Sequence, residues 1–274
     1  MDLYTSVSYE LSRKLTTRYS TSFSSSSRLF PATVRKHIYA IYGLVRIADE
    51  IVDTYTGSDQ LAVLDQLEQD TYASWKTGYS TNPIIHAFVS TARQFSMDKK
   101  LVTAFFHSMR LDTTPHHYTQ KLYEEYIYGS AEVIGLMCLV VFCEGDKKQY
   151  EQLESGARRL GAAYQKVNFL RDIANDHEQL GRWYFPTGSF DTFDDAVKNV
   201  IIADIQSDFD AAESAIHGLP KNIQPAVDLS RSYYQTLLDK LTVTPAAMLK
   251  TSRVRVNDGF KAGLLARAHV RRYL

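Results

Sequence analysis

The spacing of apolar residues limits the fold of this chain more than any other feature of its sequence. Between polar breaks they recur every three or four positions, in two clear series: Ile38, Ile41, Tyr42, Val45 and Ala48, then Val197, Ile201, Ile205, Phe209 and Ala212. This spacing puts apolar side chains on one face of an α-helix. Convincing strand-like alternation of apolar and polar residues is missing. We therefore expect an all-α protein of roughly nine to eleven helices.

Helix breakers are sparse, and the start signals for helices agree with this interpretation. The chain has 13 glycines and 7 prolines among 274 residues, which leaves room for long helices. Ser58-Asp59, Asp98 and Thr244-Pro245 each precede a helical pattern, at 61–69, 99–110 and 246–250. The length allows one large domain with a sizeable core, and we expect a single domain over residues 1–274.

Composition argues against several classes of protein. The 31 basic residues balance 31 acidic ones, which disfavours nucleic acid as a partner, and 45% hydrophobic residues disfavour disorder. Cys138 and Cys143 lie in an apolar stretch and indicate neither a disulfide framework nor a zinc site. That stretch, 133–143, is shorter than the ~20 residues of a membrane span, so we expect a buried helix.

The first residues lack the basic start and apolar block of a secretory signal and carry Asp2 and Glu10. We therefore expect the mature protein to begin here and to be cytoplasmic.

Two segments place acidic residues where the inner face of a helix should be. Asp49 and Asp53 are four positions apart, and Asn168, Asp172 and Asp176 repeat this spacing twice. Side chains four apart leave the same side of a helix. Their neighbours are largely apolar, so neither helix presents a broadly polar face. Like charges at this spacing destabilise a helix by ~0.2–0.5 kcal/mol, and by more out of water, so a compensating cation is expected.

A divalent metal is the natural cation for these acids. Oxygen ligands alone suit Mg²⁺, which takes one or two carboxylates together with waters and substrate phosphate oxygens. Two facing clusters could hold a diphosphate between them through bridging metal ions. Arg46 and Arg171, each close to an acid motif, offer planar donors for phosphate oxygens.

Simpler explanations exist for these features. Acidic pairs are common on solvated helix faces, and each arginine could form an ordinary salt bridge. The one histidine cluster, His116-His117, follows Thr-Thr-Pro and favours a surface loop over a metal site.

At these motifs the chain resembles the squalene/phytoene synthase family, the head-to-head trans-isoprenyl diphosphate synthases. The resemblance spans most of the length and rests on RIADEIVD at 46–53, on YIYGSAEVIG at 126–135 and above all on NFLRDIANDHEQLGRWYFP at 168–186. It implies an isoprenoid synthase-type helical bundle, one domain over 1–274, with a central active-site cavity.

The resemblance also implies roles for individual residues. The metal ligands, for two or three Mg²⁺ ions, would be Asp49, Asp53, Asn168, Asp172 and Asp176. Arg46 and Arg171 would contact diphosphate, and the substrate channel would be lined by Ser22, Phe23, Tyr42, Tyr126 and Gln165. The four aspartates, Tyr42 and Tyr126 would be catalytic. Tyr42 lies two turns before Asp49 on the same helix face, so both should point into one cavity.

The implied reaction is a Mg²⁺-dependent head-to-head condensation of two allylic prenyl diphosphates through a cyclopropyl diphosphate intermediate. We expect geranylgeranyl diphosphate as substrate and phytoene as product. A squalene or dehydrosqualene synthase acting on farnesyl diphosphate is the alternative, with NADPH needed only for squalene. A terpene cyclase and a non-catalytic scaffold or assembly protein with this fold are further alternatives, although a scaffold has no reason to keep all four aspartates.

Three questions stay open at this point. Glu132, where relatives often have a small residue, faces either solvent or the cavity. The basic segment 250–274 either attracts anionic lipid headgroups at the inner membrane face, where a hydrocarbon product would leave, or forms a solvated helix with Arg253 or Arg255 reaching the diphosphate. The oligomeric state is either a monomer or a homodimer.

Overall fold

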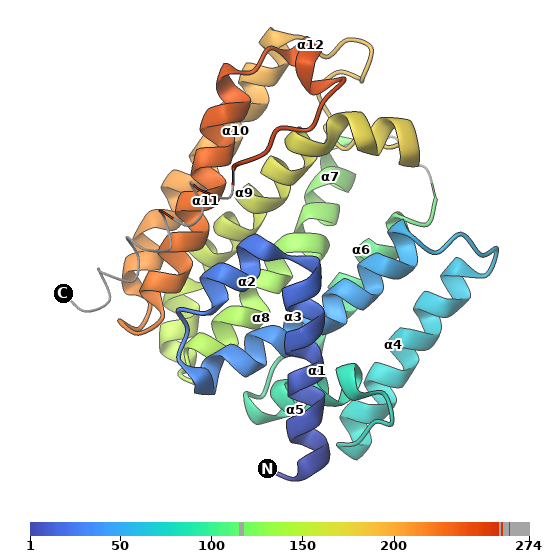
Figure 1. Cartoon of the computed structure of the whole chain (residues 1–274), viewed down its shortest axis with the longest axis vertical. Helices are drawn as coiled ribbons and strands as arrows, with labels where there is room; N and C mark the ends of the chain where they lie inside the picture. The colour runs from blue at the N-terminus through green and yellow to red at the C-terminus, as the bar shows by residue number, and fades with distance from the viewer. Residues whose placement is uncertain (115–117, 258, 260–262, 264–274) are drawn as a thin grey trace.

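In the computed structural model, which describes residues 1–114, 118–257, 259 and 263, helices joined by loops make up these residues, and they contain no strand (Figure 1). The helices are α1 (Leu3–Tyr19), α2 (Thr21–Ser27), α3 (Ala32–Asp53), α4 (Gln60–Thr77), α5 (Pro83–Gln94), α6 (Lys99–Leu111), α7 (Gln120–Ile127), the π-helical η1 (Tyr128–Glu132), α8 (Val133–Phe142), α9 (Lys147–Leu180), α10 (Asp195–Gly218), α11 (Gln224–Val243) and α12 (Ala246–Leu249). The all-α prediction is confirmed.

Local sequence explains where several helices begin and end. Asp98 accepts a hydrogen bond from the backbone N–H of Lys100 at the start of α6, and Asp146 does the same for Gln149 in α9. Gly181 ends α9 with φ of 63°, a left-handed conformation that glycine adopts without strain. Asp59 precedes α4 as predicted, but its carboxylate accepts from the Tyr55 hydroxyl instead of capping the helix.

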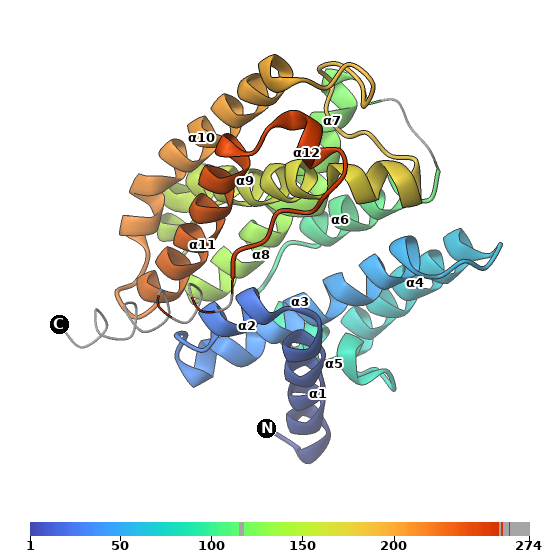
Figure 2. The ribbon, with the colours of Figure 1, turned by 45° about the horizontal axis from the view of Figure 1, so that its top comes forward.

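The long helices are arranged around α9, which has 34 residues and packs against α8, η1, α10 and α11. Figures 1 and 2 show α10 and α11 at one end of the molecule and α1, α4 and α5 at the other, with α8 and α9 between them. One apolar cluster joins α3, α5, α6 and α8, and a second joins α9, α10 and α11. The α3 motif therefore borders the first cluster and the α9 motif the second, although α9 also contributes Leu153 to the first.

Helices α7, η1 and α8 are continuous over Gln120–Phe142. By length and composition this helix could cross a membrane, and it is the one helix among the described residues that could. Its most apolar stretch is 56% buried inside the fold, as in the core helix of a globular protein. The apolar run at 133–143 forms α8 and the residue after it, and most of its side chains are buried, in agreement with the sequence prediction.

Two glycines inside helices mark places where backbones approach closely. A Cβ on Gly129 would lie 2.4 Å from the carbonyl oxygen of Ala104 in α6, and one on Gly161 would lie 2.7 Å from that of Ala131. Neither position has space for a side chain, which justifies the cost of about 1 kcal/mol for glycine inside a helix. The π-helical segment is thus held between α6 and α9.

Candidate active site

A cavity of about 810 Å³ lies between α2, α3, the continuous helix Gln120–Phe142, α9, α10 and α11. Its two ends differ in chemistry. Around the C-terminal ends of α3 and α9 its walls carry acids and arginines, whereas Phe30, Phe142 and Leu153 line it far from those ends. An elongated space with one charged end and one apolar end suits a ligand with an anionic head and a hydrocarbon tail.

Both acid motifs line this cavity. Asp49 and Asp53 reach it from the last two turns of α3, and Asn168, Asp172 and Asp176 reach it from α9. The burial pattern of α3 explains its orientation, because Leu44, Ala48 and Val52 pack into the core beside the two aspartates. The structure therefore brings together all five predicted metal ligands, whose roles stay predictions.

The electrostatics of the site show that the two motifs are close neighbours. Loss of contact with water, followed by the charge of Asp53, raises the pKa of Asp49 to about 7. Loss of contact with water, followed by the charge of Asp172, likewise raises the pKa of Asp176 to about 7, and Asp53 adds to this rise. Asp53 belongs to α3 and Asp176 to α9, so repulsion acts between the two helices as well as within each one. A cation between them would relieve it.

Arginines already pair with one aspartate of each motif. Arg182 donates to Asp53 Oδ1 at 3.0 Å. Asp172 accepts from Arg171, at 2.9 and 2.5 Å, and pairs with the Nε of Arg253 at 2.6 Å. Asp49 and Asp176, by contrast, form no ion pair with a described residue. Each motif thus combines one aspartate held by arginine with one that is free to bind a cation.

The donor set fits Mg²⁺. All the candidate ligands are carboxylate or amide oxygens, and the Asn168 Oδ1 atom is buried without a hydrogen-bond partner. Among the described residues, no group of three or more His, Cys, Asp or Glu side chains is gathered closely enough to hold a metal ion. In proteins Mg²⁺ usually keeps waters and takes only one or two carboxylates together with substrate phosphates.

The other predicted residues also lie along the cavity. Arg46, Gln165 and Arg171 line it near the acids, and the ring of Phe23 stacks on Tyr42 with centroids 5.0 Å apart. Arg46 forms a short ion pair with Glu50 and lies over the ring of Tyr19, 4.4 Å from its centroid. Ser22 belongs to α2, but its side chain lies outside the described residues.

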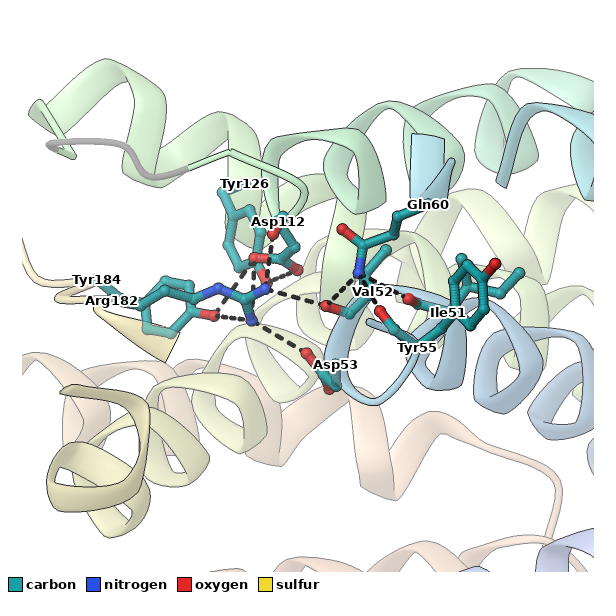
Figure 3. A network of polar contacts seen from close by, with 9 residues as sticks. All are labelled: Ile51, Val52, Asp53, Tyr55, Gln60, Asp112, Tyr126, Arg182 and Tyr184. Atoms are coloured by element: carbon teal, nitrogen blue, oxygen red, sulfur yellow. Dashed lines mark hydrogen bonds and ion pairs between the residues drawn. The ribbon is translucent and has the colours of Figure 1, made fainter. Parts of the chain in front are cut away.

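Several functional candidates were missed by sequence reasoning, and they form the network in Figure 3. Asp112, only 8% exposed, accepts from the hydroxyls of Tyr126 at 2.6 Å and Tyr184 at 3.3 Å. Arg182 donates to Tyr184 at 3.2 Å, and to the Asp112 backbone oxygen at 2.7 Å. Arg182 and Tyr184 lie within the recognised 168–186 motif, but the sequence assigned them no role. Nothing in the sequence around Asp112 indicated that this residue would be buried at the cavity.

The open questions from the sequence have different outcomes. Glu132 accepts from the Nε of Arg158 on α9 at 2.6 Å and does not line the cavity. Arg253 does line the cavity, where it pairs with Asp172, whereas most of the basic segment and His116-His117 lie outside the described residues. Of the two side chains expected to reach the diphosphate, Arg253 therefore lies at the charged end, whereas Arg255 does not line the cavity.

Comparisons with known proteins agree with this geometry. The family model for squalene/phytoene synthase matches residues 16–259. A phytoene synthase from Arthrospira platensis is 32% identical over 193 residues, which cover 65% of this chain but only 61% of that protein. A 4,4'-diapophytoene synthase from Staphylococcus haemolyticus (strain JCSC1435) is 26% identical over 205 residues, 73% of this chain and 70% of that protein.

Two solved structures share the fold. A dehydrosqualene synthase in complex with a ligand superposes with a TM-score of 0.81 at 18% identity, covering 97% of both chains. A squalene synthase from Alicyclobacillus acidocaldarius superposes with a TM-score of 0.77 at 22% identity, covering 88% of this chain and 95% of that one.

Proposed function

The chain belongs to the squalene/phytoene synthase family, and from this premise we propose that it is a prenyltransferase that joins two allylic prenyl diphosphates head to head. The product of the first half-reaction is a cyclopropyl diphosphate. Loss of its diphosphate gives a cation that rearranges and then becomes a linear hydrocarbon, by loss of a proton for phytoene or by gain of a hydride for squalene. The observation that carries the proposal is the pair of acid motifs lining one cavity from α3 and α9. Repulsion between Asp53 and Asp176 across that gap supports a shared anion bridged by cations.

The residues at the charged end have separate tasks in this proposal. Asp49, Asp53, Asn168, Asp172 and Asp176 hold Mg²⁺, which neutralises the diphosphate when bound so that it can leave. Arg171 and Arg253, both at the cavity and already next to Asp172, donate hydrogen bonds to phosphate oxygens. Arg46 does the same from α3.

The cavity walls beyond the acidic residues protect a carbocation intermediate from water. Loss of an allylic diphosphate leaves a carbocation that water would destroy, and the cavity is lined there by apolar and aromatic side chains. Phe169 and Tyr184, which line it, stack with centroids 4.0 Å apart, and Tyr126 lies 5.3 Å from Tyr184. Their ring faces stabilise positive charge without attacking it as nucleophiles.

The extent of the cavity lining along α9 is the ground on which we propose geranylgeranyl diphosphate as substrate and phytoene as product. Asp172 and Leu153 line it from the same helix, 19 positions apart, which is about 28 Å along the axis. With carbon–carbon bonds of about 1.5 Å, the extended sixteen-carbon main chain of a geranylgeranyl group measures about 20 Å, and that of a farnesyl group about 15 Å. This span is long enough for the longer tail together with diphosphate and metal, and it exceeds what the shorter tail needs.

The alternative is a squalene or dehydrosqualene synthase that uses farnesyl diphosphate. This alternative is supported by the similarity of the chain to the relative named 4,4'-diapophytoene synthase. Among these products only squalene requires NADPH, which supplies hydride to the last cation, so the reductant separates squalene from the other two, and the substrate separates phytoene from dehydrosqualene.

The test is a product assay with purified protein, Mg²⁺ and radiolabelled farnesyl or geranylgeranyl diphosphate, each with and without NADPH. We expect phytoene from geranylgeranyl diphosphate, independent of NADPH and abolished by EDTA. Squalene or dehydrosqualene as the main product would establish the alternative. A cyclic product would identify a terpene cyclase. Binding of diphosphate without any hydrocarbon product from either substrate would refute the enzymatic proposal.

A further inference from the structure

Asp112 is a buried acid at the cavity that belongs to neither acid motif. It ends α6, and its side chain meets Tyr126 from α7 and Tyr184 from the segment after α9 (Figure 3). Its carboxylate is only 4% exposed and lies 3.7 Å from the nearest Arg182 nitrogen. Burial of an ionised acid costs free energy of folding unless the charge is fully paired. The burial of Asp112 at the cavity therefore suggests a function for it.

The hydrogen bonds around Asp112 have a fixed direction. A guanidinium can only donate hydrogen bonds, so the Tyr184 hydroxyl accepts one from Arg182 at 3.2 Å. The same hydroxyl donates its own hydrogen bond to Asp112. An ionised carboxylate only accepts, so the Tyr126 hydroxyl donates to Asp112 Oδ2 at 2.6 Å. The single proton of Tyr126 is therefore committed to Asp112, and the lone pairs of its oxygen are left for other partners.

Tyr126 and Asp112 both line the cavity. Because the hydroxyl proton points at Asp112, the lone pairs of the oxygen, and not its proton, are what Tyr126 can offer to the cavity where cationic intermediates of the proposed reaction form. A phenol free to rotate would instead turn its proton toward that space for part of the time, and a proton there opposes a cation. A short hydrogen bond to a charged acceptor also makes the phenol oxygen more electron-rich.

We propose that Asp112 is a positioning residue that acts through Tyr126: it fixes the hydroxyl proton away from the cavity so that the phenol oxygen faces the carbocation. Arg182 and Tyr184 complete this arrangement by holding the other carboxylate oxygen. The inference rests on the proposed function, because it assigns Asp112 to the cationic steps of that reaction.

A double-mutant cycle separates this role from a structural one. Turnover and KM are measured for wild type, Asp112→Asn, Tyr126→Phe and the double variant. Asn keeps the shape of Asp but is a weaker acceptor and can turn a donor toward the phenol. We expect Asp112→Asn to lower kcat about tenfold or more with KM changed by less than about threefold, and to have less than about a twofold effect once Tyr126 is Phe.

A matched control comes from another buried acid. Asp208, 1% exposed, pairs with Lys166 at 2.7 Å and Arg159 at 2.8 Å between α9 and α10, away from the cavity lining. Any effect of Asp208→Asn on kcat should be the same whether residue 126 is Tyr or Phe. Thermal melting of the metal-free and substrate-free proteins gives a second readout, and there the Asp112 and Tyr126 substitutions should also be non-additive.

The outcomes distinguish the inference from the proposed function. If wild type makes a hydrocarbon and the two losses simply multiply, Asp112 does not act through Tyr126 and the inference is wrong while the function stands. If wild type makes no product from either prenyl diphosphate, both fail. Non-additive kcat together with non-additive melting supports the inference.

Discussion

The two acid motifs face one cavity but are held in different ways. On α3, Asp53 is bound by Arg182, whose side chain is 9% exposed and which also donates to the backbone oxygens of Val52 and Asp112. On α9, Asp172 is bound by its neighbour Arg171 and by Arg253, whose side chain is 47% exposed. The α3 motif is thus tied to a buried arginine, although the side chain of Asp53 itself is 43% exposed, whereas the α9 motif is held in part by an arginine that reaches it from the surface.

This difference indicates a division of labour. A buried arginine with several partners keeps its position when a ligand arrives, so the α3 side offers a preformed half of the site. An exposed arginine can exchange a carboxylate for a phosphate oxygen at little cost, so the α9 side can rearrange around substrate. Four experiments test the comparison.

The largest expected effect is on catalysis, from Asp172→Asn. The change keeps the shape and removes one charge from a proposed metal ligand, so turnover should fall by roughly a thousandfold, about 4 kcal/mol. Circular dichroism and the melting midpoint should show that folding survives. Near-normal turnover would mean that the metal ligands have been assigned wrongly.

Arg182→Gln should mainly affect stability. It leaves the buried Asp112 without its neighbouring cation, and loss of one partner of a buried ion pair costs about 3–5 kcal/mol. The pair with Asp53, whose side chain is 43% exposed, adds little to this. Urea unfolding measures this loss. A variant as stable as wild type would show that the α3 motif is not anchored by the buried network.

Mg²⁺ together with an inert diphosphate analogue should stabilise the wild-type protein. At a ligand concentration a hundred times its dissociation constant the gain is about 2.7 kcal/mol, seen as a higher melting midpoint. The Asp172→Asn variant should show little of this gain. An equal shift in both proteins would place the diphosphate away from the α9 motif, and no shift in wild type would favour a scaffold.

Arg253→Gln should have the smallest effect on folding. Its side chain is about half exposed, and ion pairs of that kind contribute less than about 1 kcal/mol. The KM for prenyl diphosphate should nevertheless rise several-fold, as expected for the loss of a phosphate contact. If instead stability fell as far as in Arg182→Gln, the two sides of the site would be held alike.

The sequence was sufficient for the helices and the acid motifs because both depend on local spacing. Asp49 and Asp53, or Asp172 and Asp176, share a helix face whatever surrounds them. The network of Asp112 could not be predicted in this way. It joins Asp112 to an arginine 70 positions later, and that arginine to the end of α3, 129 positions before it. Such contacts are set by how the helices pack.

The π-helical turn η1 has a consequence for the shape of the cavity. The residues with which the continuous helix lines it include a series spaced by four: Tyr126, Ser130, Ile134, Cys138 and Phe142. In a regular α-helix, at about 100° per residue, the first and last of these would be about 160° apart around the axis. The extra residue in the π turn cancels about 100° of that rotation. One helix therefore keeps a single row of side chains facing inward from the charged end to the apolar end, and deleting one residue from the turn would rotate half of that row out of the cavity.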